Sequence, residues 1–335
     1  VIGTDGGLLS APVSLTRARL MPGERLELLV DLTGMEGSSF QLMSYGSELP
    51  NGILGSPQVG NGMATLDGYD QNALNGSDFA LVSFTVGSQT SDPVTTIPAA
   101  LIPTNAFSEA DADITRSFTF APQTMGMQQM IEGPFTINGE IMDMGVINLT
   151  VPLGNTEIWS FTNSTQIGHP FHVHDVEFNI LDRNGAAPDP WETGWKDVVY
   201  IPPMGSARVI MRFEDFADPD TPYMYHCHML MHEDEGLMGQ FVVVDPNDVT
   251  EHVAPSITVW PIPCADVINI QFSNASGPMV ATLSDAAGRT VLTEKLALTN
   301  NAARMDVNGI GAGTYLLSIT DHAAKRLTQP VIIAH

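Results

Sequence analysis

The chain has 335 residues, of which 43% are hydrophobic, and its formal net charge is −25. This length allows two or three domains with cores of their own. The acidic balance argues against nucleic acid and anionic membranes as partners, no apolar run approaches the ~18 residues of a membrane helix, and the two cysteines argue against a disulfide framework.

Residues 1–95 are expected to form the first unit, part of a β-sandwich. In the stretch Leu20–Asp31 a Pro-Gly turn signal is followed by an apolar-rich run, which predicts a strand. Further strands are predicted at Phe40–Met43 and Phe79–Val86. Nothing in this unit has the spacing of a catalytic site, so it is assigned a structural role.

Residues 96–114 are interpreted as a linker, because the stretch around them is polar and carries Pro93, Pro98 and Pro103. Three methionines follow at Met125, Met127 and Met130. Thioethers favour Cu(I), but methionines also fill loops and cores, and the sequence does not decide whether these three bind metal.

Residues 115–248 form the second predicted unit, a complete sandwich of short strands separated by Gly/Pro turns. The predicted strands are Ser117–Ala121, Ile147–Pro152, Glu157–Thr162, Val176–Leu181, Lys196–Ile201, Ala207–Phe213, Met224–His228 and Gly239–Val244. The predicted fold class is all-β, with one partial and one complete Greek-key sandwich and a third, small sandwich at the C-terminus.

A histidine cluster, His169-Pro-Phe-His172-Val-His174, lies within the second unit. Alternate residues of a strand share a face, so His172 and His174 point the same way. His169 is offset by three residues and is expected on the loop that enters the strand. A lone histidine would be interpreted as an ordinary core or surface residue, but a second cluster follows.

The second cluster is Tyr225-His226-Cys227-His228-Met229, with His232 just beyond it. In a strand, His226 and His228 share one face and Cys227 points to the other. A turn would bring His232 back towards Cys227. A His₂Cys set built from His169, Cys227 and His232 is typical of blue copper. Zinc also takes Cys and His, but neighbouring strand side chains diverge, which makes this a poor zinc spacing.

These stretches resemble the third and fourth copper motifs of the multicopper oxidases. The resemblance runs from residue 1 to about residue 245 and is strongest to the branch of bacterial cuprous oxidases, bilirubin oxidases and spore-coat laccases. It also rests on Asn138-Gly139, Asn155–Trp159, Gly194–Val198 and Tyr223–His228. It implies cupredoxin-like domains, copper as the cofactor, and oxidation of a small phenol, aromatic amine or metal ion with dioxygen as acceptor.

The resemblance also implies roles for individual residues. Type 1 copper would be held by His169, Cys227 and His232, and the trinuclear cluster would be held in part by His172 (type 2) and by His174, His226 and His228 (type 3). Cys227 would pass electrons through its flanking histidines. Glu233 matches a proton-relaying acid of the family, although a solvated surface charge is the equal alternative.

Two departures from the family's pattern stand out. The axial position ten residues after the cysteine reads Leu237, with Met238 next to it. We expect a non-coordinating Leu237, which would raise the copper potential; a one-residue shift that lets Met238 bind is the alternative. The first histidine is His169, so the two further HxH motifs of a full oxidase are missing. The start resembles the middle of the family's second domain and predicts a truncation, with a genuinely shortened protein as the alternative.

Residues 256–335 show alternating apolar strands between tight turns, such as Ala281–Val291 and Gly313–Ile319. This part resembles the C-terminal sorting domain of the type IX secretion system. The Asp285-x-x-Gly-Arg289 turn of that family is present, while its usual opening is altered to Trp260-Pro-Ile-Pro263. The resemblance implies recognition by the secretion machinery, export through the periplasm and a secreted or cell-surface location.

The sequence therefore predicts a secreted multicopper oxidase that lacks its first domain. Two alternatives remain. The chain as given would load only type 1 copper and act as an electron-transfer or copper-binding cupredoxin without oxidase activity. A copper nitrite reductase would also combine cupredoxin domains, but it does not need the paired HxH and HCH motifs. The electron donor and the oligomeric state cannot be read from the sequence.

Overall fold

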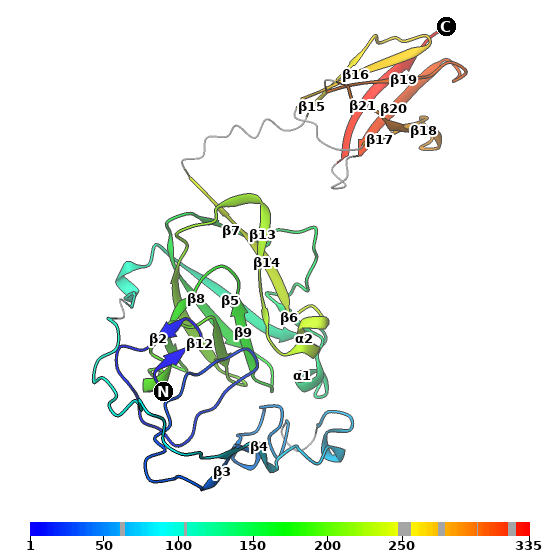
Figure 1. Ribbon diagram of the computed structural model, residues 1–335. Helices are drawn as coiled ribbons and strands as arrows, with labels where there is room; N and C mark the ends of the chain where they lie inside the picture. Colours follow the sequence, from blue (N-terminus) through cyan, green and yellow to red (C-terminus); the bar gives the residue numbers. More distant parts are fainter. Residues whose placement is uncertain (61–63, 104–105, 247–255, 274–278, 300, 321–325) are drawn as a thin grey trace. The chain divides into compact units, whose positions relative to one another are not determined.

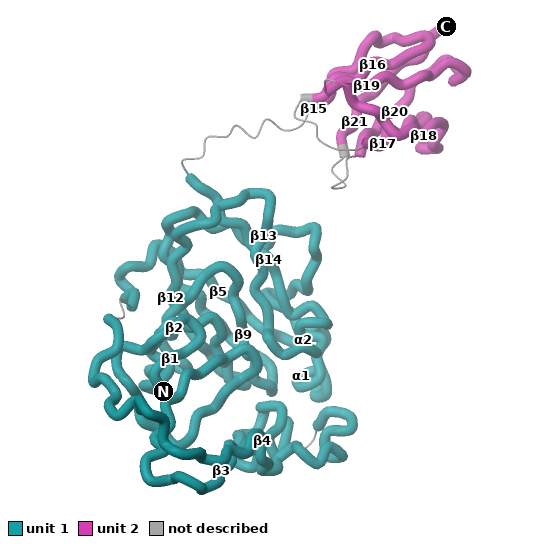
Figure 2. The backbone as a smooth tube through the Cα atoms, viewed as in Figure 1, with its two compact units in different colours: residues 1–247 teal, residues 248–335 magenta. Residues whose placement is uncertain are grey.

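The computed structural model describes residues 1–60, 64–103, 106–246, 256–273, 279–299, 301–320 and 326–335 (Figure 1). The chain divides into two compact units, residues 1–247 and residues 248–335, here called unit 1 and unit 2 (Figure 2). The finer division of unit 1 into a partial domain, a linker and a complete domain stays a prediction. No helix in the described part of the chain has the length and apolar character that a membrane crossing requires.

The main body of unit 1 is a sandwich of two five-stranded sheets. The first sheet has the order β10-β12-β8-β5-β6, with strands Phe178–Arg183, Ser206–Arg212, Thr156–Asn163, Ile114–Pro122 and Phe135–Ile137. The second has the order β11-β9-β13-β14-β7, with strands Val198–Ile201, His169–Val173, Asp218–Cys227, Met238–Val244 and Leu149–Pro152. Both sheets line one core, in which Phe118, Trp159 and Phe171 are buried completely or almost so.

Short helices cover one end of this sandwich. Helices α1 (Gln129–Glu132) and α2 (Leu230–Asp234) lie side by side there (Figure 1). A Cβ atom added at Gly133, where α1 ends, would lie 3.0 Å from Glu235 at the end of α2. The 3₁₀-helices are η1 to η4, at Gly46–Glu48, Tyr69–Gln71, Glu109–Asp111 and Pro190–Glu192. Helix α2 matters most, because it carries His232.

The N-terminal part of unit 1 contains two small two-stranded sheets. They pair β1 (Gly3–Thr4) with β2 (Gly7–Leu8), and β3 (Ser39–Tyr45) with β4 (Asp78–Thr85). The predicted strands near residues 40 and 80 are therefore present.

The strand predicted within Leu20–Asp31 was wrong. Among the described residues this stretch forms one isolated bridge, from Glu27 to Gly3, and Leu28, Leu29 and Val30 are exposed. A strand needs a neighbour that takes up its backbone N–H and C=O groups, and the apolar pattern alone does not supply one.

Buried charges join the N-terminal segment to the sandwich. Lys196 is fully buried, and its Nζ lies 2.9 Å from Asp5 Oδ2 and 3.0 Å from Glu24 Oε1. Burial raises the pKa of Glu24, an effect that Lys196 opposes. Lys196 is thus the anchor between two parts of the chain that are distant in sequence.

Unit 2 is a second, smaller sandwich with its own core. One sheet has the order β15-β16-β19, with strands Ser256–Trp260, Val267–Ser273 and Ala302–Asp306. The other has the order β18-β17-β20-β21, with strands Thr290–Leu296, Met279–Ser284, Gly313–Thr320 and Arg326–Ile333. The turn between β17 and β18 is closed by Asp285, whose carboxylate accepts hydrogen bonds from the Arg289 backbone N–H at 3.0 Å and from its guanidinium at 2.8 Å.

Candidate metal centre

Strand β13 presents its last residues to two different sides of the second sheet. It pairs with β9 so that His226 lies opposite His172 and Cys227 lies opposite Phe171. Directly opposed residues share a face and successive residues do not. Two clusters of potential metal ligands form among the described residues, one around Cys227 and one around His226.

The first cluster consists of His169, Cys227 and His232, and all three side chains are buried. The Cys227 Sγ lies 3.6 Å from His169 Nδ1 and 3.7 Å from His232 Nδ1. Helix α2 begins three residues after Cys227 and returns His232 to the sulfur, as the sequence predicted. His169 is the first residue of β9 and not part of the loop before it, because it pairs with Ile201 of β11.

Hydrogen bonds fix the protonation of the His169 ring. The Thr165 hydroxyl donates to Asn163 Oδ1 at 2.7 Å, so its oxygen is left to accept from His169 Nε2 at 2.9 Å. The proton of His169 therefore sits on Nε2, and the Nδ1 lone pair faces Cys227. Such outer hydrogen bonds set the tautomer of histidines that bind metals.

Burial keeps the first cluster uncharged in the protein alone. It raises the pKa of the Cys227 thiol to about 12 and lowers the pKa of His232 to about 4. It also lowers the pKa of His169 well below its ordinary value. Neutral imidazoles and a thiol that needs a cation to ionise fit a soft metal ion, and the ring of Phe135 shields both histidines at centroid distances of 5.1 and 4.8 Å.

Strand register decides which of Leu237 and Met238 lies on the Cys227 face of the sheet. Met238 opens β14 and pairs with His226, so it lies on the His226 face of the sheet. Leu237 is fully buried in the same apolar cluster as Cys227, and its carbonyl accepts from the Cys227 N–H at 3.0 Å. The geometry favours Leu237 over Met238 as the neighbour of the sulfur.

The second cluster is formed by His172, His174 and His226, with His228 beside them. The Nε2 atoms of His174 and His226 lie 3.3 Å apart. The carbonyl of Asp197 can only accept, so His172 donates to it from Nδ1 at 2.7 Å. His226 Nδ1 lies 3.3 Å from both Glu233 Oε2 and the Cys227 carbonyl. The Nε2 lone pair of His172 is therefore not used by that hydrogen bond, and Nε2 of His226 faces Nε2 of His174.

Two imidazoles of the second cluster are also kept uncharged, which is the form that binds a metal. Burial, followed by the charges of neighbouring imidazoles, lowers the pKa of His174. Burial lowers the pKa of His226, and Glu233 partly offsets this. A hollow of about 460 Å³ beside the cluster is lined in part by His172, His174 and Asp197. It leaves room for further ligands.

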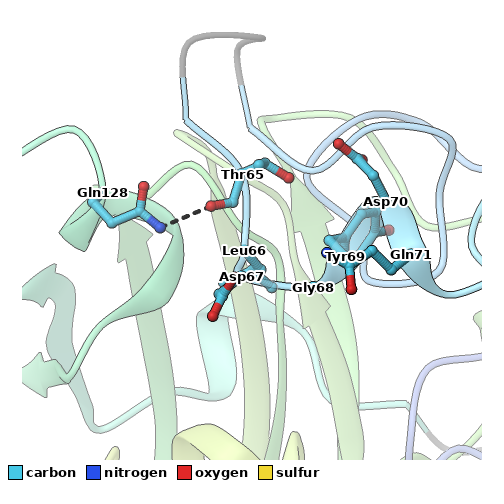
Figure 3. Close-up of a pocket in the computed structure, with 8 residues that line it drawn as sticks. All are labelled: Thr65, Leu66, Asp67, Gly68, Tyr69, Asp70, Gln71 and Gln128. Carbon is cyan, nitrogen blue, oxygen red and sulfur yellow. Dashed lines mark hydrogen bonds between the residues drawn. The ribbon is translucent and has the colours of Figure 1, made fainter.

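Two other features of unit 1 do not include the clustered histidines. Met125 and Met127 are 85% and 52% exposed, and whether they and Met130 bind Cu(I) stays an open question. A hollow of about 390 Å³ is lined by residues 65–71 and Gln128, whose side chain donates to the Thr65 carbonyl at 2.7 Å (Figure 3). Its described lining residues include no imidazole or thiol, so they offer neither of the ligand types that fill the two clusters.

Sequence reasoning missed the residues that hold the ligands in place. Thr165 and Phe135 had no recognisable signal. Thr165 is four residues before His169, and only the fold shows that its hydroxyl meets the ring. The contribution of Asp197 to His172 comes from its backbone carbonyl, which no side-chain pattern reveals.

Comparisons with known proteins match the part of the chain that holds the two clusters. A family model described as multicopper oxidase matches residues 113–247, and one described as a secretion system C-terminal sorting domain matches residues 258–334. The cell division protein FtsP of Xenorhabdus nematophila is 30% identical over 72% of this chain and 45% of its own length. A laccase of Haloferax volcanii is 31% identical over 68% of this chain and 35% of its own length.

Solved structures give the same result. A laccase-like multicopper oxidase, CueO, from Ochrobactrum sp. matches with a TM-score of 0.58 and 32% identity, over 72% of this chain and 50% of that one. The multicopper oxidase McoA of Aquifex aeolicus matches with a TM-score of 0.57 and 26% identity, over 73% and 49%. The chain spans half or less of the length of each of these four proteins.

Proposed function

The chain belongs to the multicopper oxidase family and carries a C-terminal secretion sorting domain, and from this premise we propose that it is the copper-binding part of a secreted oxidase. The oxidase would take single electrons from a small reductant and use dioxygen as the acceptor. One observation carries the proposal: Cys227 faces one ligand cluster, while its neighbours in the chain, His226 and His228, face the other.

Each cluster has a defined role in this proposal. His169, Cys227 and His232 would hold type 1 copper, and His172, His174, His226 and His228 would supply half of a trinuclear site. Copper bound there would accept electrons one at a time and deliver them to dioxygen. The peptide bonds between Cys227 and its flanking histidines provide the shortest covalent path between the clusters.

The protein's own groups prepare both clusters for this chemistry. Thr165 keeps the His169 Nδ1 lone pair directed at the sulfur, and the buried Phe135 ring helps to exclude water. The Glu233 carboxylate is partly exposed and lies 3.3 Å from His226 Nδ1, which supports the proposal that it would hold a proton between solvent and the second cluster. The net charge of −25 favours cationic or neutral electron donors, such as metal ions, aromatic amines or phenols.

The sorting domain indicates a secreted or cell-surface location. The proposed route is export through the periplasm by the type IX machinery.

The second candidate function is an electron-transfer or copper-binding module without oxidase activity. Two observations favour it. The four imidazoles of the second cluster are half of the set that the proposed trinuclear site needs. One relative is named as a cell division protein and not as an oxidase. Copper titration followed by visible absorption and oxygen uptake separates the two candidates. Copper at both clusters with reductant-dependent oxygen uptake supports the oxidase. About one copper per chain without oxygen uptake supports the module, and the absence of a thiolate-to-copper band contradicts both.

Leu237→Met is expected to lower the reduction potential of the copper bound by Cys227. Leu237 is fully buried in the same cluster as Cys227 and offers no ligand atom, whereas a thioether at this position would supply a further weak ligand that favours Cu(II). Redox titration of the visible band measures the change. Met238→Leu is the matched control and should leave the potential unchanged. A rise in that variant, with no drop in Leu237→Met, would show that residue 238 and not residue 237 is the neighbour of the copper.

A further inference from the structure

We propose that Arg25 and Gly23 are positioning residues for the second cluster, called the four-histidine cluster from here on. They act on His172 and His228 from a segment that lies about 150 residues or more earlier in the chain. The inference rests on the proposed function, since it concerns metal binding by these imidazoles. It assigns the N-terminal segment a part in the site and not only a structural role.

The guanidinium of Arg25 is held in one orientation by four acceptors. Its Nη1 and Nη2 donate to the two Asp197 carboxylate oxygens at 2.7 and 2.8 Å. The same nitrogens donate to the carbonyls of Gly23 at 2.9 Å and Asp5 at 2.8 Å. A bidentate arginine–carboxylate pair fixes direction as well as distance. Arg25 therefore holds the Asp197 side chain against the N-terminal segment.

Asp197 connects this pair to the cluster. Its side chain is held by Arg25, and its backbone carbonyl accepts the His172 Nδ1 proton at 2.7 Å. That hydrogen bond keeps the His172 proton on Nδ1 and leaves Nε2 to bind a metal. A shift of Asp197 would loosen the ring and allow the other tautomer, which would protonate the ligand atom.

Gly23 acts on the neighbouring ring by close contact. Its φ is +87°, and an added Cβ would lie 2.7 Å from Cδ2 and 2.9 Å from Cγ of His228. The backbone of residue 23 thus packs directly against this imidazole. Buried Lys196 forms ion pairs with both Asp5 and Glu24, which lie next to the contacts made by Gly23 and Arg25. These ion pairs keep the N-terminal segment packed against the cluster.

The expected effects on folding and on metal affinity differ enough to distinguish a positioning role for Arg25 from a contribution to stability. The Arg25 side chain is 52% exposed, and an exposed ion pair contributes about 0–1 kcal/mol to folding. Removing a hydrogen bond that orients a metal-binding histidine typically weakens metal affinity about 10–100-fold. Loss of Arg25 should therefore show in metal binding at the histidines much more than in folding.

The test compares Arg25→Met with Arg17→Met in the full chain. Arg17 is also 52% exposed and also pairs with a carboxylate, Glu48, which makes it a matched control. Cu(II) is the probe, with calorimetry for the four-histidine cluster and the visible thiolate band as an internal reference for Cys227. We expect affinity at the histidines to fall about 10–100-fold in Arg25→Met alone, with the band unchanged. Equal affinities in wild type and Arg25→Met, or the same loss in Arg17→Met, would overturn the inference.

A second readout needs no metal. Nitrogen-15 NMR of the His172 ring reports which nitrogen carries the proton. We expect the wild-type and Arg17→Met rings to hold it on Nδ1 and the Arg25→Met ring to populate both tautomers, with Arg25→Lys in between. An unchanged tautomer in Arg25→Met contradicts the inference alone, whereas a wild-type chain that takes no Cu(II) at the four imidazoles contradicts the proposed function as well.

Discussion

Cys227→Ser is expected to abolish the visible thiolate-to-copper band completely, while the chain stays folded. The sulfur is the atom on which His169 Nδ1 and His232 Nδ1 converge, and both lie within 3.7 Å of it. A serine hydroxyl does not ionise near neutral pH and is a hard ligand, so type 1 copper cannot form. Replacing the weak S–H donor by a hydroxyl of similar size should change the free energy of unfolding by only about 1 kcal/mol.

Cys264→Ser is the control for this substitution. Cys264 is also buried and also free, but it lies in unit 2, where its Sγ donates to the Ile332 carbonyl at 3.4 Å. The copper band should be unchanged in this variant. If Cys227→Ser retained the band, or if Cys264→Ser removed it, the assignment of the copper sulfur would be wrong.

Lys196→Met should lower the free energy of unfolding of unit 1 more than Cys227→Ser or Arg25→Met does. It removes the cation that lies 2.9 and 3.0 Å from two buried carboxylates, Asp5 and Glu24. Breaking a buried ion pair by deleting one partner typically costs about 3–5 kcal/mol, because the remaining charge stays desolvated. Urea denaturation followed by tryptophan emission measures the loss, since Trp159, Trp191 and Trp195 lie in unit 1 and only Trp260 lies in unit 2.

The loss in Lys196→Met should also depend on pH. Burial already raises the pKa of Glu24 with Lys196 in place, and removal of the cation raises it further. A carboxyl whose pKa is higher in the folded chain binds more protons there than in the unfolded chain, so stability falls as the pH rises. The deficit should therefore be larger at about pH 8 than at about pH 5.

The triple variant Lys196→Met, Asp5→Asn, Glu24→Gln, which leaves no buried charge, should recover much of the lost stability. A deficit that did not change with pH would indicate that the lysine contributes through packing and not through charge.

Much of the candidate site could be predicted from the sequence, because a strand's two-residue period decides which side chains share a face. That period separated Cys227 from His226 and His228 before any fold was known, and the short spacing to His232 required a turn back. The two-residue period could not predict where strands exist or begin, because that depends on which neighbouring strand is available for pairing. Leu20–Asp31 has an apolar pattern without a sheet, and His169 was placed in a loop although β11 extends the strand to include it.

The supporting residues could not be predicted, since their contacts join distant parts of the chain. Arg25 and Asp197 are 172 positions apart in sequence, and Lys196 meets Asp5 across a similar distance. Neither pair has a local pattern that marks it. Asp197 also acts on His172 through a backbone carbonyl, a group that every residue carries.

The most direct test of the central claim is copper-edge anomalous diffraction from a copper-loaded crystal. We predict two separate sites, one bonded to the Cys227 sulfur between His169 and His232, and one among His172, His174, His226 and His228. A single copper shared by Cys227 and its flanking histidines, or copper bound nowhere near that sulfur, would contradict the account.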